Sequence, residues 1–259
     1  MQRLILAGAT AFALSAGAAA IAAEDMPPLP HHEWSFQGPF GTYDRAAAQR
    51  GFQVYKEVCS ACHSMNLLYY RNLTELGLTE DQAKAIAAEV QVPALSDDGS
   101  PIERPGRLSD HFKAPFPNEL AAAAANGGKA PPDLSVIVKA REGGPNYVYG
   151  ILTGYVPYDK LTPEQIKEFN VSKDDNFNLH FLGHRIAMPA PLADDKVTYV
   201  DGTKATLQQE ASDVVTFLAW ASEPHLEARN RTGIRAILFM LALAGLMYAT
   251  KRAIWADKH

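Results

Sequence analysis

Five consecutive residues, Cys59–His63, have the side chains and the spacing that hold a haem covalently. They read Cys-Ser-Ala-Cys-His, the C-x-x-C-H pattern of c-type haem attachment. Cys59 and Cys62 lie three residues apart, so on one helical turn both sulfurs share a face and can reach the two vinyl groups of one porphyrin. His63 follows at once and can bind the iron from the proximal side. The pattern predicts one covalent haem c.

Two other kinds of site also use cysteine pairs. A zinc site could combine Cys59 and Cys62 with His180 and His184, which have an H-x3-H spacing. A zinc finger separates its two ligand pairs by roughly 12–15 residues, whereas more than a hundred residues separate them here. A thioredoxin-like dithiol would need a strand before the cysteines, and residues 46–58 predict a helix instead. Haem attachment is the favoured interpretation.

A low-spin, electron-carrying haem also needs an axial ligand on its distal face. Elimination among the six methionines leaves Met188, because the others lie near the N-terminus, in an apolar C-terminal segment or, as Met65, only two residues past His63. The prolines that follow Met188 restrict the backbone and could hold its thioether at a fixed approach. His180 and His184 remain as alternative ligands, and bis-histidine ligation typically gives a lower reduction potential.

The elements that must position these residues are predicted to be helices and loops. Asp44 is a suitable N-cap for a helix that runs into the haem motif. Residues 93–117 are dense in Pro, Gly, Ser and Asp and are predicted to be looped. Period-2 alternation is missing, so at most a small hairpin is expected near Lys196–Thr203, where Asp201-Gly202 marks a turn. Further helices are predicted at residues 79–90, 118–125, 131–141, 147–152 and 203–222, which makes the fold all-α.

The two ends of the chain predict its place in a cell. Residues 1–23 combine a basic start, an apolar run and an A-x-A pattern, which indicates a signal peptide, with an uncleaved anchor as the alternative. Residues 24–228 would then form a periplasmic haem domain. Residues 229–250 are long enough for a transmembrane anchor if Arg235 reaches the surface, and a buried core helix is the alternative. Residues 251–259 would form a cytoplasmic tail. Three basic residues lie on each side of the span, so the positive-inside rule does not decide the orientation. The signal peptide and the haem motif, which indicate export of the haem domain, give this orientation instead.

Charge is distributed unevenly along the chain. Residues 24–228 hold 28 acidic and 17 basic residues, a net charge of −11, whereas the whole chain carries −5. An acidic exported domain suggests a basic partner that approaches by electrostatic steering. A solvated acidic surface kept for solubility is an equally common alternative. No nucleic-acid partner is expected.

The haem motif is shared by many cytochromes, but the ordered set of segments around it is far more specific. With this set, the chain resembles the cytochrome c1 family, the haem subunits of the cytochrome bc1 complex (ubiquinol–cytochrome c oxidoreductase). The chain lacks the extra cysteine pair of some bacterial members, so packing must hold its long loops. The matching segments are residues 50–59 before the motif, Arg104-Pro105-Gly106, Ala130–Ser135, Leu152–Tyr155, Met188 with its prolines, Asp201-Gly202-Thr203 and Trp220–Pro224.

The resemblance implies a class I cytochrome c-type haem domain with inserted loops, plus one C-terminal transmembrane helix. It implies haem c as the cofactor, with Met188 as the distal ligand and Pro132 among the cofactor-binding residues. Arg141 and Tyr147 match positions near the haem propionates and edge. It implies an electron-transfer subunit of the respiratory or photosynthetic chain, which itself makes and breaks no substrate bond; catalysis would belong to the complex.

The partners implied are cytochrome b, the Rieske iron–sulfur subunit and a cytochrome c acceptor, in a dimeric complex. The complex would lie in the bacterial inner membrane, with the haem domain on the periplasmic side. A free-standing, membrane-anchored cytochrome c that shuttles electrons to a terminal oxidase is the first alternative. A haem enzyme such as a peroxidase is the second; it would need an open distal site or a second haem motif, and Met188 argues against it.

Overall fold

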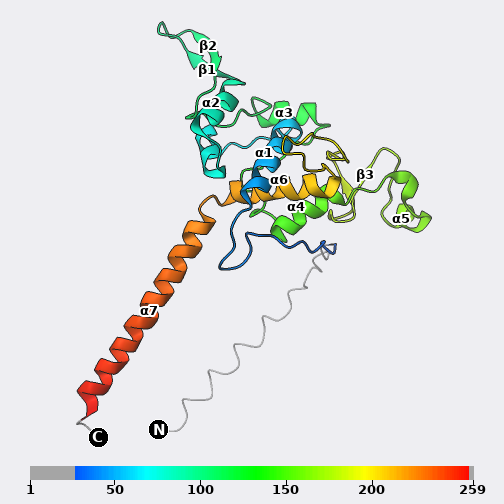
Figure 1. Ribbon diagram of the computed structural model, residues 1–259. Helices are drawn as coiled ribbons and strands as arrows, with labels where there is room; N and C mark the ends of the chain where they lie inside the picture. The colour runs from blue at the N-terminus through cyan, green and yellow to red at the C-terminus, as the bar shows by residue number, and fades with distance from the viewer. Residues whose placement is uncertain (1–26, 257–259) are drawn as a thin grey trace, which may run out of the picture.

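The computed structural model describes residues 27–256, so the predicted signal peptide, residues 1–23, lies outside the described residues. Helices make up most of the regular structure, which confirms the all-α prediction, and two short antiparallel hairpins complete it. One long helix, α7, extends away from a compact body (Figure 1). The helices are α1 (Arg45–Glu57), α2 (Glu80–Ala88), α3 (Glu119–Ala125), α4 (Gly144–Thr153), α5 (Pro163–Glu168), α6 (Leu207–Ser222) and α7 (Leu226–Trp255), with 3₁₀ turns at Cys59–Ala61, Tyr70–Leu76 and Tyr158–Lys160.

The core of the body is the contact between α1 and α6. Helix α1 begins at the predicted N-cap, where the Asp44 carboxylate accepts a hydrogen bond from a first-turn N–H at 3.1 Å. The two helices approach so closely that a Cβ at Gly51 would collide with the carbonyl of Asp213. Phe52 and Phe217 pack beside this crossing, with ring centroids 5.6 Å apart. The helices predicted at residues 79–90, 118–125 and 203–222 are also present, as α2, α3 and α6, with N-caps Thr79, Asn118 and Thr206.

A buried ion pair fixes α1 against α6. Arg50 donates to both carboxylate oxygens of Asp213, at 2.8 and 2.9 Å, and to Asp201 at 3.0 Å. The Asp213 side chain is fully buried, so this bidentate geometry offsets its loss of hydration. The bonds with Asp213 raise the pKa of Arg50 above its usual value. The crossing is therefore specified by charge as well as by shape.

Residues 131–141 do not form the predicted helix. The Leu134 N–H donates to the Ser64 carbonyl at 2.9 Å, and the Ser135 hydroxyl accepts from the Leu67 N–H at 3.0 Å. These bonds to the chain just after the haem motif replace helical ones, because tertiary contacts outweigh a weak local preference. The segment ends in turns, and α4 begins only at Gly144; it is longer than the helix predicted at residues 147–152.

A hairpin occupies part of the region that was predicted to be looped. Strand β1 (Gln91–Leu95) pairs with β2 (Pro101–Pro105), and Figure 1 shows the hairpin projecting from the body. Three of its ten residues are prolines, which argue against a strand in sequence. An isolated ribbon tolerates them because each strand has one edge without a partner strand, where the missing N–H costs nothing.

The second hairpin also lies away from its predicted place. Strand β3 (Asn176–Phe177) pairs with β4 (Arg185–Ile186). Residues 196–203 form turns without a strand pair. Asp201-Gly202 does make the predicted turn, but the Asp201 side chain binds the Thr203 N–H at 2.9 Å, so no ladder follows.

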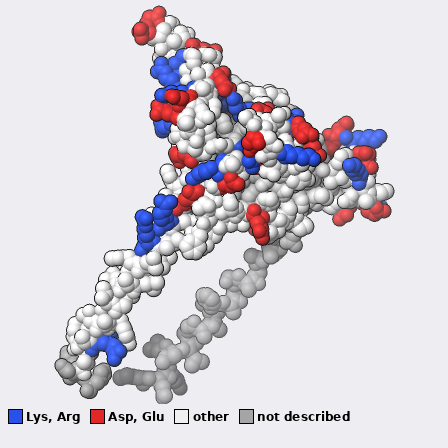
Figure 2. All heavy atoms as spheres, in the orientation of Figure 1, with Lys and Arg blue, Asp and Glu red and all other residues white. Residues whose placement is uncertain are grey.

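Within the described residues, α7 is the one helix long and apolar enough to cross a membrane. It has 30 residues, its most apolar window has a mean hydropathy of 1.7, and none of that window is buried, which disfavours a core helix. Figure 2 shows its middle free of charged side chains, between basic groups toward either end. At its base, Glu227 accepts hydrogen bonds from Arg45 at 3.0 Å and from the Tyr43 N–H at 2.9 Å. The helix is thus tied to the start of α1, and it extends beyond the predicted span 229–250 at both ends.

Candidate haem site

The haem motif continues directly from the end of α1. Cys59–Ala61 form one 3₁₀ turn, in which the Cys59 carbonyl accepts from the N–H groups of Cys62 at 3.1 Å and His63 at 2.9 Å. Cys59 is half-buried against the core, and burial raises the pKa of its thiol to about 12. Cys62 is exposed. The single turn predicted for these residues is present, and His63 follows it directly.

The His63 ring is oriented by a main-chain carbonyl from the 131–141 segment. The Pro132 oxygen lies 2.8 Å from His63 Nδ1. Because a carbonyl only accepts, Nδ1 carries the proton and donates it, and Nε2 keeps its lone pair. Burial lowers the pKa of His63, against the opposing effect of the Pro132 bond, so the imidazole is held neutral. A neutral imidazole with its other nitrogen hydrogen-bonded is the form that binds metal ions in proteins.

Asp133 in turn holds Pro132 in place. One Asp133 oxygen accepts from the Ser64 hydroxyl and the Asn66 N–H, both at 2.8 Å, and the other accepts from the Ser135 N–H at 2.8 Å. Burial opposes ionisation of this carboxyl, but the hydrogen bonds outweigh burial and lower its pKa. The loop that carries Pro132 is therefore clamped to the chain that follows the haem motif.

Met188 lies two residues beyond β4 and is half-buried. Its carbonyl accepts a hydrogen bond from the Tyr155 hydroxyl at 3.0 Å. The Asn176 side chain donates to the Ala187 carbonyl at 3.4 Å, next to the β3–β4 pair. The segment is thus held on one side by β3 and on the other by the end of α4.

The two alternative ligands, His180 and His184, are both engaged in other contacts. The His184 ring stacks on Phe177 with centroids 5.3 Å apart, and its Nδ1 lies 3.0 Å from the Asn178 carbonyl. His180 Nδ1 lies 2.6 Å from the Pro28 carbonyl. Each ring has Nδ1 beside a main-chain carbonyl, as His63 has, so these contacts do not decide between Met188 and the two histidines.

Arg141 and Tyr147 lie close to each other around the start of α4. Arg141 is exposed, and its guanidinium donates to the Ala140 carbonyl at 3.0 Å. Tyr147 is half-buried; burial raises its pKa, and the Arg141 charge acts in the opposite direction. An exposed cation beside a half-buried phenol suits an anionic group such as a haem propionate.

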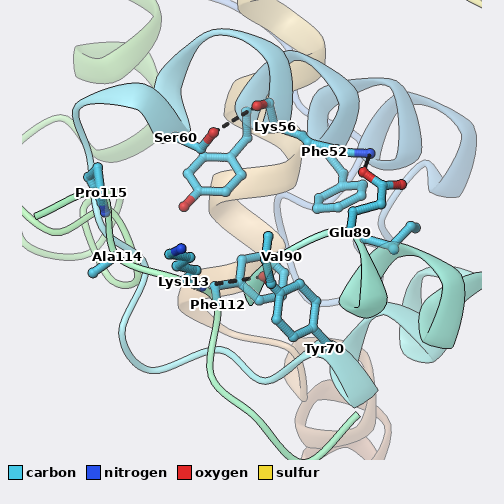
Figure 3. Close-up of a pocket in the computed structure, with 12 residues that line it drawn as sticks. Phe52, Lys56, Ser60, Tyr70, Glu89, Val90, Phe112, Lys113, Ala114 and Pro115 are labelled. Carbon is cyan, nitrogen blue, oxygen red and sulfur yellow. Dashed lines mark hydrogen bonds and ion pairs between the residues drawn. The ribbon is translucent and has the colours of Figure 1, made fainter. Parts of the chain in front are cut away.

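A cavity of about 230 Å³ lies beside the motif, with Ser60 in its lining (Figure 3). Its wall is aromatic: Tyr70 and Phe112 stack with centroids 4.8 Å apart. Lys56 and Glu89, which also line it, form an ion pair at 2.6 Å. The predicted haem ligands are not in this lining, so the cavity belongs to the packing that supports α1 rather than to the cofactor.

Within residues 27–256, no three His, Cys, Asp or Glu side chains lie close enough together to hold a metal ion. The zinc site considered for the two cysteines with His180 and His184 is therefore not formed. The haem motif carries two cysteines on one turn, and the neutral imidazole of His63 follows them directly in the chain; this is the set of residues that a covalent haem requires.

Comparison with known proteins agrees with this donor set. Residues 34–258 match the Cytochrome C1 family. The chain belongs to the cytochrome c1 family. Cytochrome c1 of Rhodospirillum rubrum is 48% identical over 269 residues, which cover 100% of this chain and 98% of that protein. A mitochondrial cytochrome c1 heme protein of Arabidopsis thaliana is 45% identical, with 97% and 80% covered. Cytochrome b/c1 of Bradyrhizobium diazoefficiens is 44% identical, covering 99% of this chain but 39% of that longer protein.

Membership of the cytochrome c1 family confirms the main predictions from sequence. The fold is the class I, all-α cytochrome c type. The chain carries one covalent haem c and serves electron transfer in a bc1 complex, and the free-standing shuttle is not favoured. The residues present fit that cofactor, because the turn at Cys59–Ala61 is followed directly by a histidine whose Nδ1 is held by a carbonyl and whose Nε2 makes no hydrogen bond to the described residues.

Three supporting residues were not predicted from sequence: Asp133, Tyr155 and Asn178. The segments Ala130–Ser135 and Leu152–Tyr155 carried the family resemblance, but nothing in them indicated which side chain supports which ligand. Asn178 is fully buried, and its sequence context gave no signal at all.

Proposed function

We propose that this chain accepts single electrons from the Rieske iron–sulfur subunit and passes them to a cytochrome c, within a bc1 complex of the respiratory or photosynthetic chain. The observation that carries the proposal is the 2.8 Å contact between His63 Nδ1 and the Pro132 carbonyl. It leaves a neutral imidazole with an unprotonated Nε2 at the end of the turn that carries Cys59 and Cys62. When bound, the haem supplies a one-electron Fe(II)/Fe(III) couple.

Each site residue has a distinct task in this proposal. Cys59 and Cys62 form the two thioethers, and His63 and Met188 are the axial ligands. The Pro132 carbonyl fixes the imidazole and makes it a stronger donor, which favours Fe(III). The Met188 thioether favours Fe(II), so the potential is higher than for two histidines.

Two further residues are proposed to contact the porphyrin. Arg141 pairs with a propionate, for which its exposed guanidinium is available. Tyr147 lies at the haem edge, with its phenol half-buried.

The proposed partners follow from charge and from the relatives. The name of the longer relative, cytochrome b/c1, joins both cytochromes and supports cytochrome b as a neighbour of this chain. The net charge of −11 on residues 24–228 favours a basic cytochrome c acceptor. The Rieske donor and a dimeric complex are proposed on the family resemblance.

We further propose that residues 24–228 lie on the periplasmic side of a bacterial inner membrane. Helix α7 would cross that membrane once, in the predicted span 229–250, and residues 251–259 would form the cytoplasmic tail. The uncharged, unburied middle of α7 supports the span. Orientation follows from haem attachment, which takes place outside the cytoplasm in bacteria.

Met188→Leu tests the axial assignment. The substitution removes the sulfur with little change of volume. We expect the ferric far-red charge-transfer band of Met-ligated haem to disappear, the reduced haem to bind carbon monoxide, and quinol-dependent reduction of cytochrome c by membranes to fall while the subunit still assembles. Met65→Leu is the matched control, because Met65 is fully buried in the core. A band that survives in Met188→Leu would place the ligand elsewhere, and one lost in Met65→Leu would place it at Met65.

A further inference from the structure

Tyr155 contacts the main chain of the proposed distal ligand. Its hydroxyl donates to the Met188 carbonyl at 3.0 Å. The residue before it, Gly154, is packed so tightly that a Cβ there would come within 2.7 Å of His180 and 2.9 Å of Asn178 Oδ1. The backbone next to Tyr155 is thus closely packed against the residues around Asn178, and the hydroxyl links this packed region to Met188.

Asn178 links the end of α4 to the turn that precedes β4 through hydrogen bonds. Its buried side chain donates to the Ile151 carbonyl at 2.7 Å and accepts from the His180 N–H at 3.0 Å. Its main chain forms a bridge with Tyr155 and donates to the His184 carbonyl at 2.8 Å. The backbone at Tyr155 and the turn that leads to Met188 are therefore hydrogen-bonded to the same residue.

The Met188 segment itself has few other attachments. Among the described residues, the Tyr155 bond is the one hydrogen bond made by residues 188–191. Two of these residues are prolines, which have no N–H to donate. A cavity of about 520 Å³ adjoins the segment, with Tyr155, Phe177 and Ala190 in its lining. Packing on that side is incomplete, so the hydroxyl carries much of the restraint.

We propose that Tyr155 is a positioning residue for the distal ligand: its hydroxyl holds the Met188 main chain so that the thioether stays bound. This role presupposes that Met188 is the ligand, as proposed above. Tyr155 then sets the fraction of molecules in which the distal position is open to a foreign ligand.

Carbon monoxide binding to the reduced, assembled complex measures that fraction. Carbon monoxide binds only after the thioether has left, so its apparent dissociation constant equals the intrinsic one divided by the open fraction. Tyr155→Phe removes the hydroxyl alone. Loss of one net hydrogen bond should raise the open fraction about fivefold, tighten carbon monoxide binding by the same factor and weaken the far-red band.

Two comparisons separate positioning from a general effect on folding. Tyr158→Phe makes the same change three residues along, where the hydroxyl makes no hydrogen bond to the described residues, and it should match the wild type. Met188→Leu gives the fully open limit. Adding Tyr155→Phe to Met188→Leu should leave carbon monoxide affinity unchanged, because no thioether remains to be positioned.

The positioning role is overturned if Tyr155→Phe binds carbon monoxide like Tyr158→Phe, or if Tyr155→Phe has the same effect with and without Met188. If Met188→Leu loses the far-red band but Tyr155→Phe binds carbon monoxide like the wild type, only the positioning role is refuted and Met188 remains the ligand. A band that persists in Met188→Leu would remove the ligand assignment and this role with it.

Discussion

Replacing Asp133 by asparagine should loosen the loop that orients His63. The carboxylate accepts three hydrogen bonds, two at one oxygen and one at the other. Asparagine has the same shape but only one acceptor atom. Whichever way its amide is turned, the NH₂ group faces a main-chain N–H, that of Asn66 or that of Ser135. No rotamer of the new side chain repairs this.

The size of the effect follows from the lost bonds and their exposure. A hydrogen bond to a charged acceptor contributes about 1.5–3 kcal/mol. Asp133 is half-buried, so water replaces part of what is lost, and a decrease of about 1.5–2 kcal/mol in unfolding free energy is expected. Ser64→Ala removes one of the three bonds and leaves both main-chain bonds, so it should cost less than Asp133→Asn. A looser Pro132 carbonyl should also make His63 a poorer donor to iron and raise the reduction potential.

The pH dependence follows from the lowered pKa of Asp133. A carboxyl group with a lower pKa in the folded than in the unfolded chain stabilises the fold above the unfolded value, about 3.9. That contribution is lost as the pH falls through the folded pKa. The difference in unfolding free energy between the wild type and Asp133→Asn should therefore be constant near pH 7 and shrink below about pH 4.

Denaturant titration of the detergent-solubilised chain, followed by haem absorbance, gives the unfolding free energies, and a redox titration gives the potential. The clamp is refuted if Asp133→Asn unfolds at the same denaturant concentration as the wild type at pH 7. It is also refuted if the gap between them is as large at pH 3 as at pH 7.

Three further predictions concern the core, the cofactor and the acceptor. Arg50→Leu leaves Asp213 charged and buried and should cost about 3–5 kcal/mol of unfolding free energy. Asp201→Asn, at the exposed end of the same network, should cost below about 1 kcal/mol. Equal denaturant midpoints for these two variants would contradict the prediction. Acid–acetone should leave haem on the wild-type polypeptide, and Cys62→Ala should keep at most one thioether; complete extraction from the wild type would disprove covalent attachment. Electron transfer to a basic cytochrome c should slow steeply between 0.1 and 1 M salt, because the Debye length falls from ~10 to ~3 Å. A rate that does not change with salt would refute electrostatic steering by the acidic domain.

The parts of the structure that sequence predicted are those specified by neighbouring residues. The haem motif and the Asp44 cap depend on contacts within four residues, and both are present as expected. The 131–141 helix was wrong because its helical spacing competes with bonds to residues 64–67, far away in sequence. The β1–β2 hairpin was missed because its prolines argue against a strand unless the ribbon is known to stand alone.

The supports of the ligands were harder to predict for the same reason. Pro132 meets His63 from 69 residues away, and Tyr155 meets Met188 from 33 residues away. Neither separation has a periodicity that a sequence can show. Met188 itself was predicted by elimination and by resemblance, without any signal for the residue that holds it.

Helix α4 joins the supports of the two proposed axial ligands into one packed unit. The segment before α4 supplies the Pro132 carbonyl, and Tyr155 follows its end and holds Met188. Helix α4 packs on α6, which packs on α1, whose end carries the haem motif. A small displacement of α4 should therefore alter the positions of both proposed axial ligands together.

A matched pair of substitutions tests that coupling. Val148 in α4 and Val92 in β1 are each 9% exposed, so truncating either to alanine removes similar buried surface, at a cost of about 1–3 kcal/mol. Val148→Ala should change the reduction potential and carbon monoxide binding together, because it loosens the element that both supports share. Val92→Ala should change neither, because β1 pairs chiefly with β2 and neither strand supplies a ligand support. If both variants shift the potential equally, the ligands respond to overall stability, and α4 has no special part in holding them.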